Sequence, residues 1–132
     1  MSPRWVSTLK FDPDGLIPAI IQDARSKEVL MVAYMNRQAI RKTLSAGITH
    51  FYSRSRKRIW MKGEISGHLQ RVTGIALDCD KDALLVQVAQ TGAACHTGYR
   101  SCFFLRSKDG RGWRTVGRKL FDPAEVYGKK PR

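Results

Sequence analysis

The sequence predicts a single α+β domain, built mostly from antiparallel strands with one clear helix. Short apolar runs rich in β-branched residues alternate with turns that contain Gly, Asp or basic residues, which is typical of strands. Only one segment combines helical spacing with a capping residue at each end. The length of 132 residues suits one domain, and no linker rich in Gly, Ser or Pro divides residues 1–132.

The first part of the chain predicts a strand hairpin followed by the helix. Apolar residues fill positions 16–22 and 29–35, and the short turn between them indicates that the two strands pair. Asn36 is a favourable helix N-cap, and Gly47 provides a C-terminal stop. We therefore expect the helix to cover residues 36–46.

The rest of the chain predicts further strands separated by turns. Apolar or alternating patterns place these strands at residues 48–53, 59–62, 69–78, 83–89 and 101–106. Gly74 predicts an irregularity in its strand, and residues 90–100 (QTGAACHTGYR) predict a loop or a short helical turn. We expect the segment beyond Phe121 to be peripheral.

The charge balance is strongly basic, with 24 Lys and Arg residues against 11 Asp and Glu residues and a formal net charge of +13. Such an excess favours partners or substrates that carry several phosphates. The longest apolar runs are far shorter than the roughly 18–20 residues needed to cross a bilayer. Residues 1–15 also lack the apolar segment of a signal peptide. We therefore expect a cytoplasmic protein that does not cross a membrane.

Three cysteines, Cys79, Cys95 and Cys102, are candidate zinc ligands. Three protein ligands with one open position is the layout of a catalytic zinc site. The absence of a C-x-x-C motif argues against a zinc ribbon or finger, and against the zinc-dependent nucleobase deaminases. On spacing alone, it is equally possible that all three are buried small apolar residues.

A cluster of carboxylates surrounds the first cysteine, at Asp78, Asp80 and Asp82. If this segment is extended, the three side chains point to one side, where they repel one another unless a hard cation binds. Magnesium or calcium is therefore expected there. An EF-hand is excluded because Ala83 and Ala89 occupy the positions that its Gly and Glu require. The alternative is a solvated acidic turn between two strands.

A basic and aromatic segment in the middle of the chain predicts a binding site for an anionic substrate. Arg and Ser side chains beside flexible Gly residues are suited to phosphate and carboxylate groups. The candidate substrate-binding residues are Arg54, Arg56, Trp60, Lys62, Glu64 and Ser66. His68 and His96 are the candidate general acid or base residues, and His96 adjoins a candidate metal ligand.

Six segments together resemble the phosphoribosyl-AMP cyclohydrolase family of histidine biosynthesis. They are LIPAIIQ (16–22), VLMVAYMN (29–36), SRSR (53–56), WMKGEISG (60–67), DCDKDALL (78–85) and CHTGYRSCF (95–103). The resemblance covers residues 14–105, in the expected order. The basic tail at residues 106–132 lies outside it.

The resemblance implies a hydrolase that opens the adenine ring of phosphoribosyl-AMP between N1 and C6. It implies an intertwined homodimer whose zinc sites draw ligands from both chains, here Cys79, Cys95 and Cys102. It also assigns magnesium to Asp78, Asp80 and Asp82. In this reading His68 or His96 exchanges the proton during ring opening, and nucleic acid is bound only nonspecifically.

Two other interpretations stay open at this point. A basic nucleic-acid-binding module with structural zinc would explain the charge, and it predicts salt-dependent binding without turnover. A structural metal-binding protein, whose cysteines hold a dimer together, predicts that Cys102→Ser unfolds or dissociates the protein.

Overall fold

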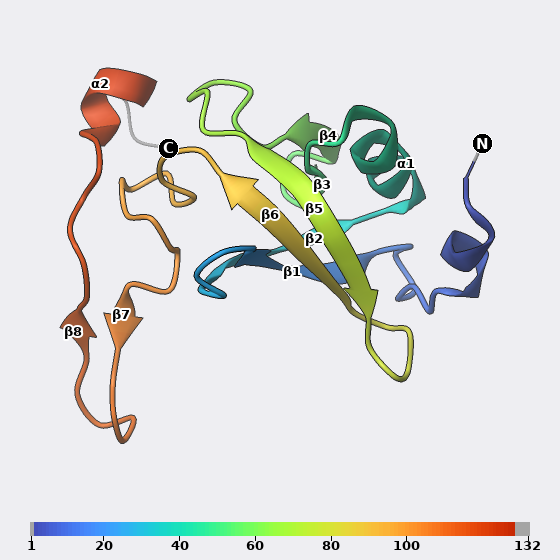
Figure 1. The fold of residues 1–132 in the computed structure, drawn as a ribbon, viewed down its shortest axis with the longest axis horizontal. Coiled ribbons are helices and arrows are strands. Elements are labelled where there is room, and N and C mark those ends of the chain that lie inside the picture. Colours follow the sequence, from blue (N-terminus) through green and yellow to red (C-terminus); the bar gives the residue numbers. More distant parts are fainter. Residues whose placement is uncertain (1, 129–132) are drawn as a thin grey trace.

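The computed structural model describes residues 2–128. A 3-10 helix at Arg4–Thr8 precedes the first strand. The strands are β1 (Ile17–Asp23), β2 (Val29–Met35), β3 (His50–Ser53), β4 (Arg58–Met61), β5 (Gln70–Leu77), β6 (Leu84–Gln90), β7 (Leu105–Arg106) and β8 (Arg114–Thr115). The helices are α1 (Arg37–Ala46) and α2 (Pro123–Tyr127) (Figure 1). The predicted α+β class is confirmed.

The main sheet has the strand order β2-β1-β6-β5. Two antiparallel hairpins, β1–β2 and β5–β6, meet along a central parallel pair formed by β1 and β6. The expectation of mostly antiparallel strands therefore holds, and the parallel pair makes the sheet mixed. The register of β5 and β6 shifts between Val72 and Gly74, which confirms the predicted irregularity. The shorter pairs β3–β4 and β7–β8 form two separate sheets.

Helix α1 is fixed by the caps that the sequence indicates. The Asn36 side-chain oxygen accepts a hydrogen bond from the Ala39 backbone N–H at 2.8 Å. Gly47 ends the helix with a φ of 72°, in the left-handed region that favours glycine, and its N–H donates to the Thr43 carbonyl. Within residues 2–128, no helix is both long and apolar enough to span a bilayer.

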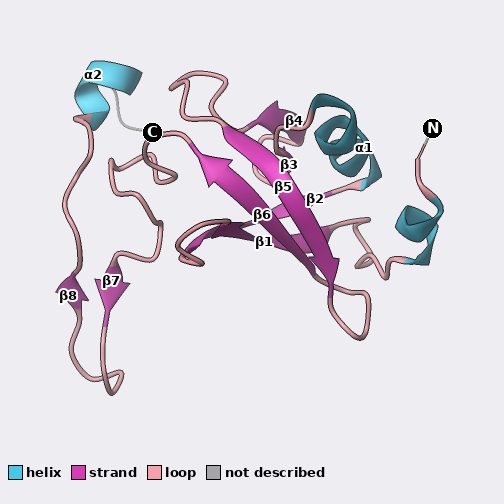
Figure 2. Ribbon diagram, viewed as in Figure 1, coloured by secondary structure: helices cyan, strands magenta, loops and turns pink. Residues whose placement is uncertain are grey.

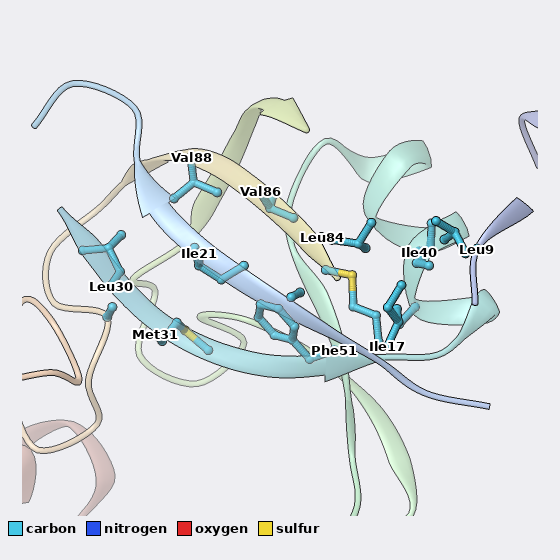
Figure 3. Close-up of a cluster of buried hydrophobic side chains, with 14 of the residues drawn as sticks. Leu9, Ile17, Ile21, Leu30, Met31, Ile40, Phe51, Leu84, Val86 and Val88 are labelled. Atoms are coloured by element: carbon cyan, nitrogen blue, oxygen red, sulfur yellow. The ribbon is translucent and has the colours of Figure 1, made fainter. Parts of the chain in front are cut away.

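One face of the main sheet packs against α1 and the β3–β4 hairpin. Apolar side chains from all three parts fill the layer between them, including Ile21, Met31, Ile40, Phe51 and Val86 (Figure 3). These side chains are almost completely buried, so this layer is the hydrophobic core. It holds the β3–β4 hairpin firmly against the sheet.

The opposite face of the main sheet is apolar but uncovered in the isolated chain. Ile20 in β1 and Val32 in β2 are paired across the strands, and they are 38% and 51% exposed. Leu85 in β6 is the parallel neighbour of Ile20 on the same face. An uncovered apolar sheet face of this kind is a candidate interaction surface.

The expected strand at residues 101–106 is wrong for most of its length. Only Leu105 and Arg106 are in a strand, and residues 101–104 form a loop (Figure 2). The Ser101 hydroxyl accepts a hydrogen bond from the Phe103 N–H and donates to the Val29 carbonyl. These local bonds compete with strand pairing. The sequence predicts a peripheral segment after Phe121. The structure places the short helix α2 in this segment. Residues 129–132 lie outside the described residues.

Candidate active site and metal-binding residues

A pocket of about 270 Å³ lies beside the β3–β4 hairpin. The hairpin, the loop that follows β4, the loop that follows β6 and helix α2 all contribute to its lining. The predicted site residues in this lining are Arg56, Trp60, Lys62, Glu64, Ser66 and His96. Ser53, Arg58 and Tyr127 are further polar residues of the lining. The structure therefore brings together cationic, aromatic, hydroxyl and imidazole side chains from distant parts of the chain.

The pocket wall is held in place by contacts behind and across it. The Trp60 ring packs against the buried Phe51 ring, with 5.1 Å between the ring centroids. Arg58 and Glu64 form an ion pair at 3.0 Å on the pocket side of the hairpin. Trp60 is thus anchored in the core on one side and faces the pocket on the other, which suits an aromatic side chain that stacks on a planar ligand.

Two of the three cysteine thiols lie next to each other, close to this pocket. Cys95 is buried, and its sulfur lies 2.9 Å from the Thr97 hydroxyl. Burial and the neighbouring Cys95 thiol raise the pKa of Cys102 to about 12, while the nearby Lys62 ammonium acts in the opposite direction. Cys102 is accessible to solvent as a residue, and its sulfur faces the other thiol. A bound cation would be needed to hold Cys102 as a thiolate at neutral pH.

Lys62 links the thiol pair to the pocket. Its ammonium lines the pocket, donates to the Ala94 carbonyl and lowers the pKa of Cys102. His96 follows Cys95 directly and also lines the pocket. A ligand in the pocket would therefore lie close to any metal ion held by the two thiols.

The loop that carries the thiol pair is fixed to the main sheet. The Cys102 N–H donates to the Leu30 carbonyl of β2 at 2.7 Å. Arg100 forms an ion pair with the buried carboxylate of Asp23 at 2.7 Å, and a longer pair with Glu28 at 3.4 Å. Hydrogen bonds from the Ser26 backbone and side chain, together with Arg100 and the Arg25 N–H, hold the pKa of Asp23 below its usual value despite burial.

The carboxylate cluster forms at the opposite end of the β5–β6 hairpin. Asp78, Asp80 and Asp82 are exposed, and each offers an oxygen within 4.8 Å of the others. The segment is not extended but forms a turn between two strands, because the Asp78 carboxylate accepts a hydrogen bond from the Asp82 N–H and Lys81 adopts a φ of 60°. The turn, and not strand alternation, brings the carboxylates together.

The carboxylates of this turn interact strongly with one another. A side-chain hydrogen bond between Asp78 and Asp82 lowers the pKa of Asp78 and raises that of Asp82. Three carboxylates this close repel one another when ionised, and a hard divalent ion would relieve that repulsion, so the donor set fits such an ion. Cys79 is exposed in the same turn. The length of the β5–β6 hairpin therefore separates Cys79 from the other two thiols within one chain (Figure 1).

Comparison with known proteins identifies the family. The family model of phosphoribosyl-AMP cyclohydrolase matches residues 31–104. The phosphoribosyl-AMP cyclohydrolase of Methanoregula boonei is 60% identical over 121 residues, which cover 92% of this chain and 95% of that protein. The protein of the same name from Pelotomaculum thermopropionicum is 55% identical over 128 residues, which cover 97% of this chain and 99% of that protein. The chain belongs to the phosphoribosyl-AMP cyclohydrolase family.

Two of the predicted catalytic and substrate-binding residues of this cyclohydrolase family member, Arg54 and His68, do not line the pocket. Arg54 stacks on the Tyr34 ring, with its guanidinium 4.2 Å from the ring centroid. Tyr34 pairs with Pro18, which places it on the uncovered face of the main sheet. His68 packs edge-on against Phe121, and its Nδ1 is buried without a hydrogen-bond partner among the described residues.

The structure of this family member also adds two pocket residues, and a buried partner for Arg100, that the sequence did not indicate. Arg58 lies between the predicted strands at 48–53 and 59–62, and only the β3–β4 pairing shows that it borders the pocket. Arg100 lies inside the CHTGYRSCF segment, but its buried partner Asp23 is far away in sequence. Tyr127 lies beyond the residues that the family model matches, in a segment with no motif. No local pattern could have indicated these partners.

Proposed function

We propose that this chain is a zinc-dependent phosphoribosyl-AMP cyclohydrolase. It would hydrolyse the N1–C6 bond of the adenine ring of phosphoribosyl-AMP, a step of histidine biosynthesis. The observation that carries the proposal is one pocket that combines three cationic side chains, Trp60 and His96 with an adjacent pair of thiols. Membership of the family, at 60% identity to the relative from Methanoregula boonei, supports the same substrate.

The pocket suits a purine nucleotide that carries two phosphates. Arg56, Arg58 and Lys62 supply positive charge for the phosphates, and Ser53 and Ser66 supply hydroxyl donors. Trp60 presents a ring supported by the core, on which the adenine base can stack. Glu64 pairs with Arg58 and would orient that guanidinium toward the substrate.

The residues present fit a zinc ion with thiolate ligands. Cys95 and Cys102 would hold zinc, and soft thiolates are the ligands this ion favours. The third ligand would be Cys79 of a second copy, because Cys79 lies at the other end of the β5–β6 hairpin. All three cysteines are unpaired thiols, as expected of metal ligands in a reducing compartment, so we propose action in the cytoplasm. Asp78, Asp80 and Asp82 would hold magnesium.

We also propose a homodimer with shared active sites, because the β5–β6 hairpin separates Cys79 from Cys95 and Cys102 within one chain. The uncovered apolar face around Ile20, Val32 and Leu85 provides a surface that a second copy would bury. Arg54 and Tyr34 border this face, so Arg54 would reach the substrate of the other copy and not the pocket of its own chain. This arrangement would bring each Cys79 turn to the thiol pair of the other chain.

Residues of the chain itself would bind the substrate, orient it and transfer the proton. Zinc, when bound, supplies Lewis-acid activation of water near neutral pH. His96 lines the pocket beside Cys95 and would transfer a proton between water and N1 of the base. His68 stays a second candidate for that proton transfer. Arg56, Arg58 and Lys62 would hold the phosphates and keep C6 facing the thiol pair.

The first test is turnover of phosphoribosyl-AMP by the purified protein with zinc and magnesium, followed by the absorbance change on ring opening. We expect turnover that is lost on chelation of zinc and restored when zinc is added back, but not when magnesium alone is added. A folded, zinc-loaded protein without turnover would contradict the proposal. Salt-dependent binding of RNA or DNA by that inactive protein would favour the nucleic-acid-binding alternative.

A further inference from the structure

The chain after β8 returns to the cysteine loop and docks on it. The Leu120 N–H donates to the Gly98 carbonyl at 2.7 Å. A Cβ atom on Gly98 would lie 2.6 Å from the Phe121 carbonyl oxygen, and Gly98 has a φ of 106°. Only glycine combines this backbone conformation with so close an approach. The segment 119–127, which we name the wall segment, is therefore fitted against the loop that carries Cys95 and Cys102.

Aromatic contacts hold the wall segment in place. The Phe121 ring packs edge-on against the His68 ring, with 4.9 Å between the ring centroids. The His68 ring is itself pressed against Gly92, where a Cβ atom would lie 2.8 Å from the ring. Phe121 thus packs against a His68 ring that is itself held by the loop at Gly92. This contact assigns His68 a packing role in addition to the chemistry considered above.

The anchored segment leads directly into the pocket. The Asp122 side chain accepts a hydrogen bond from the Ala124 N–H, and Pro123 follows it, so α2 starts at a defined position. The centroids of the Tyr127 and Phe121 rings are 6.2 Å apart. Tyr127 lines the pocket together with His96 and Arg56. Tyr127 is half-buried there. The region matched by the family model ends at residue 104, well before this segment.

We propose that the wall segment is part of the substrate site, with Tyr127 as a substrate-binding residue and Phe121 as a positioning residue. This inference rests on the proposed function, because it concerns the same pocket. Tyr127 would offer an aromatic ring and a hydroxyl group to the bound nucleotide, in the same pocket as Arg56 and Arg58. Phe121 acts through Tyr127 by fixing the start of α2 against His68.

The direct test compares Tyr127→Ala and Tyr127→Phe with the wild type, all loaded with zinc. Tyr127→Ala is expected to raise KM about 10-fold and to change kcat less than about 2-fold, because the contact is made in the bound state and not only in the transition state. Tyr127→Phe shows whether the ring or the hydroxyl is responsible. Glu125→Ala, an exposed change on the same helix, is the matched control and should behave as the wild type. A KM for Tyr127→Ala equal to that of the wild type would overturn the inference.

Phe121 supplies the second part of the test. Phe121→Ala should raise KM as Tyr127→Ala does, and Phe121→Tyr should retain the wild-type KM because it keeps a ring against His68. The double variant Phe121→Ala/Tyr127→Ala should have the same KM as the single variants, since both changes remove one contact. Additive effects would contradict the positioning role. Zinc content should stay unchanged in each variant.

A binding measurement separates this inference from the proposed function. AMP carries an adenine base and one phosphate, so it can probe the pocket by calorimetry without turnover. The affinity for AMP should fall about 10-fold in Tyr127→Ala. Suppose that Tyr127→Ala loses AMP binding and the wild type does not turn over phosphoribosyl-AMP. This result would reject the proposed reaction and support the role of the wall segment in binding. Turnover by the wild type, with unchanged AMP affinity in Tyr127→Ala, would reject only the role of the wall segment in substrate binding.

Discussion

At the scale of single residues, His96 is the side chain whose position best suits proton transfer. It lines the pocket and follows the buried thiol of Cys95 in the chain. His96→Ala should lower kcat by about 10²–10⁴-fold while zinc content stays unchanged, because a positioned general acid or base contributes a factor of that size. Steady-state turnover and metal analysis of the same preparation measure both quantities.

His68→Ala is the matched comparison, because it removes a second imidazole from the same part of the molecule. His68 does not line the pocket, so its loss should affect kcat less than the loss of His96. Full turnover by a zinc-loaded His96→Ala variant, together with a large loss in His68→Ala, would transfer the proton-transfer role to His68.

Asp23 is the residue whose ionisation should matter most for stability. Its pKa is lowered, so its contribution is fully present above the usual carboxyl value and is lost as the pH falls through the lowered value. Asp23→Asn should lower the free energy of unfolding by about 1–3 kcal/mol at neutral pH, since three donors and the Arg100 charge lose a charged acceptor. Urea unfolding at neutral pH and at about pH 3 measures this difference, which should shrink at the lower pH.

Glu28→Gln provides the control for this pH dependence. Glu28 also pairs with Arg100, but at 3.4 Å and in a partly exposed position. We expect it to change the free energy of unfolding by less than about 1 kcal/mol, as is usual for surface ion pairs. A difference between wild type and Asp23→Asn that is the same at both pH values would contradict the role given to the Asp23 carboxylate.

At the scale of elements, local patterns were sufficient where the contacts are local. The turn between β1 and β2, the caps of α1 and the irregularity near Gly74 all follow from neighbouring residues, and the structure confirms them. The parallel pairing of β1 with β6 depends on which distant strands meet, and no local pattern indicates it. The bends after Arg100 were missed because hydrogen bonds of Ser101 replace the strand pairing that its apolar neighbours favour.

Helix α1 offers a direct measure of one such local signal. Asn36→Ala removes the acceptor for the Ala39 N–H, and should lower the free energy of unfolding by about 1 kcal/mol. Asn36→Asp keeps an acceptor at the cap, so its free energy of unfolding should stay within roughly 0.5 kcal/mol of the wild type. Urea unfolding of the three proteins makes the comparison. Equal losses in both variants would show that the cap bond is not the cause.

At the scale of the whole molecule, the candidate site could be predicted only in pieces. The motifs around Trp60, Asp78 and Cys95 indicated the right residue types, because each chemistry depends on short spacing. Their arrangement could not be predicted, since Cys79 and Cys102 lie at opposite ends of one long hairpin and its continuation. Tyr127 lines the pocket only because the segment around α2 packs there, and that segment contains no motif from which its position could be predicted.

Shared active sites can be tested by mixing two inactive variants. Cys79→Ser and Cys102→Ser should each lack zinc-dependent turnover, because each removes one ligand from every site. Unfolded together and refolded with zinc, they should recover about one quarter of wild-type activity, since half of the dimers are mixed and one of their two sites is intact. The measurement is turnover per chain after refolding.

Cys95→Ser mixed with Cys102→Ser is the control for that experiment. Both changes affect the same loop, so every site in a mixed dimer still lacks a ligand and no activity should return. No recovery with Cys79→Ser and Cys102→Ser either would contradict a site built from two chains. It would then require the three thiols to meet within one chain.

The parallel pairing of β1 with β6 also has a consequence for synthesis of the protein. Strand β1 is made early, but its second neighbour emerges from the ribosome only after β2, α1, β3, β4 and β5. Until then a two-stranded ribbon leaves one edge of β1 unpaired, and such ribbons are at best marginally stable alone. The nascent chain therefore carries an exposed apolar edge through most of translation, the stage at which binding by a chaperone would protect it from aggregation.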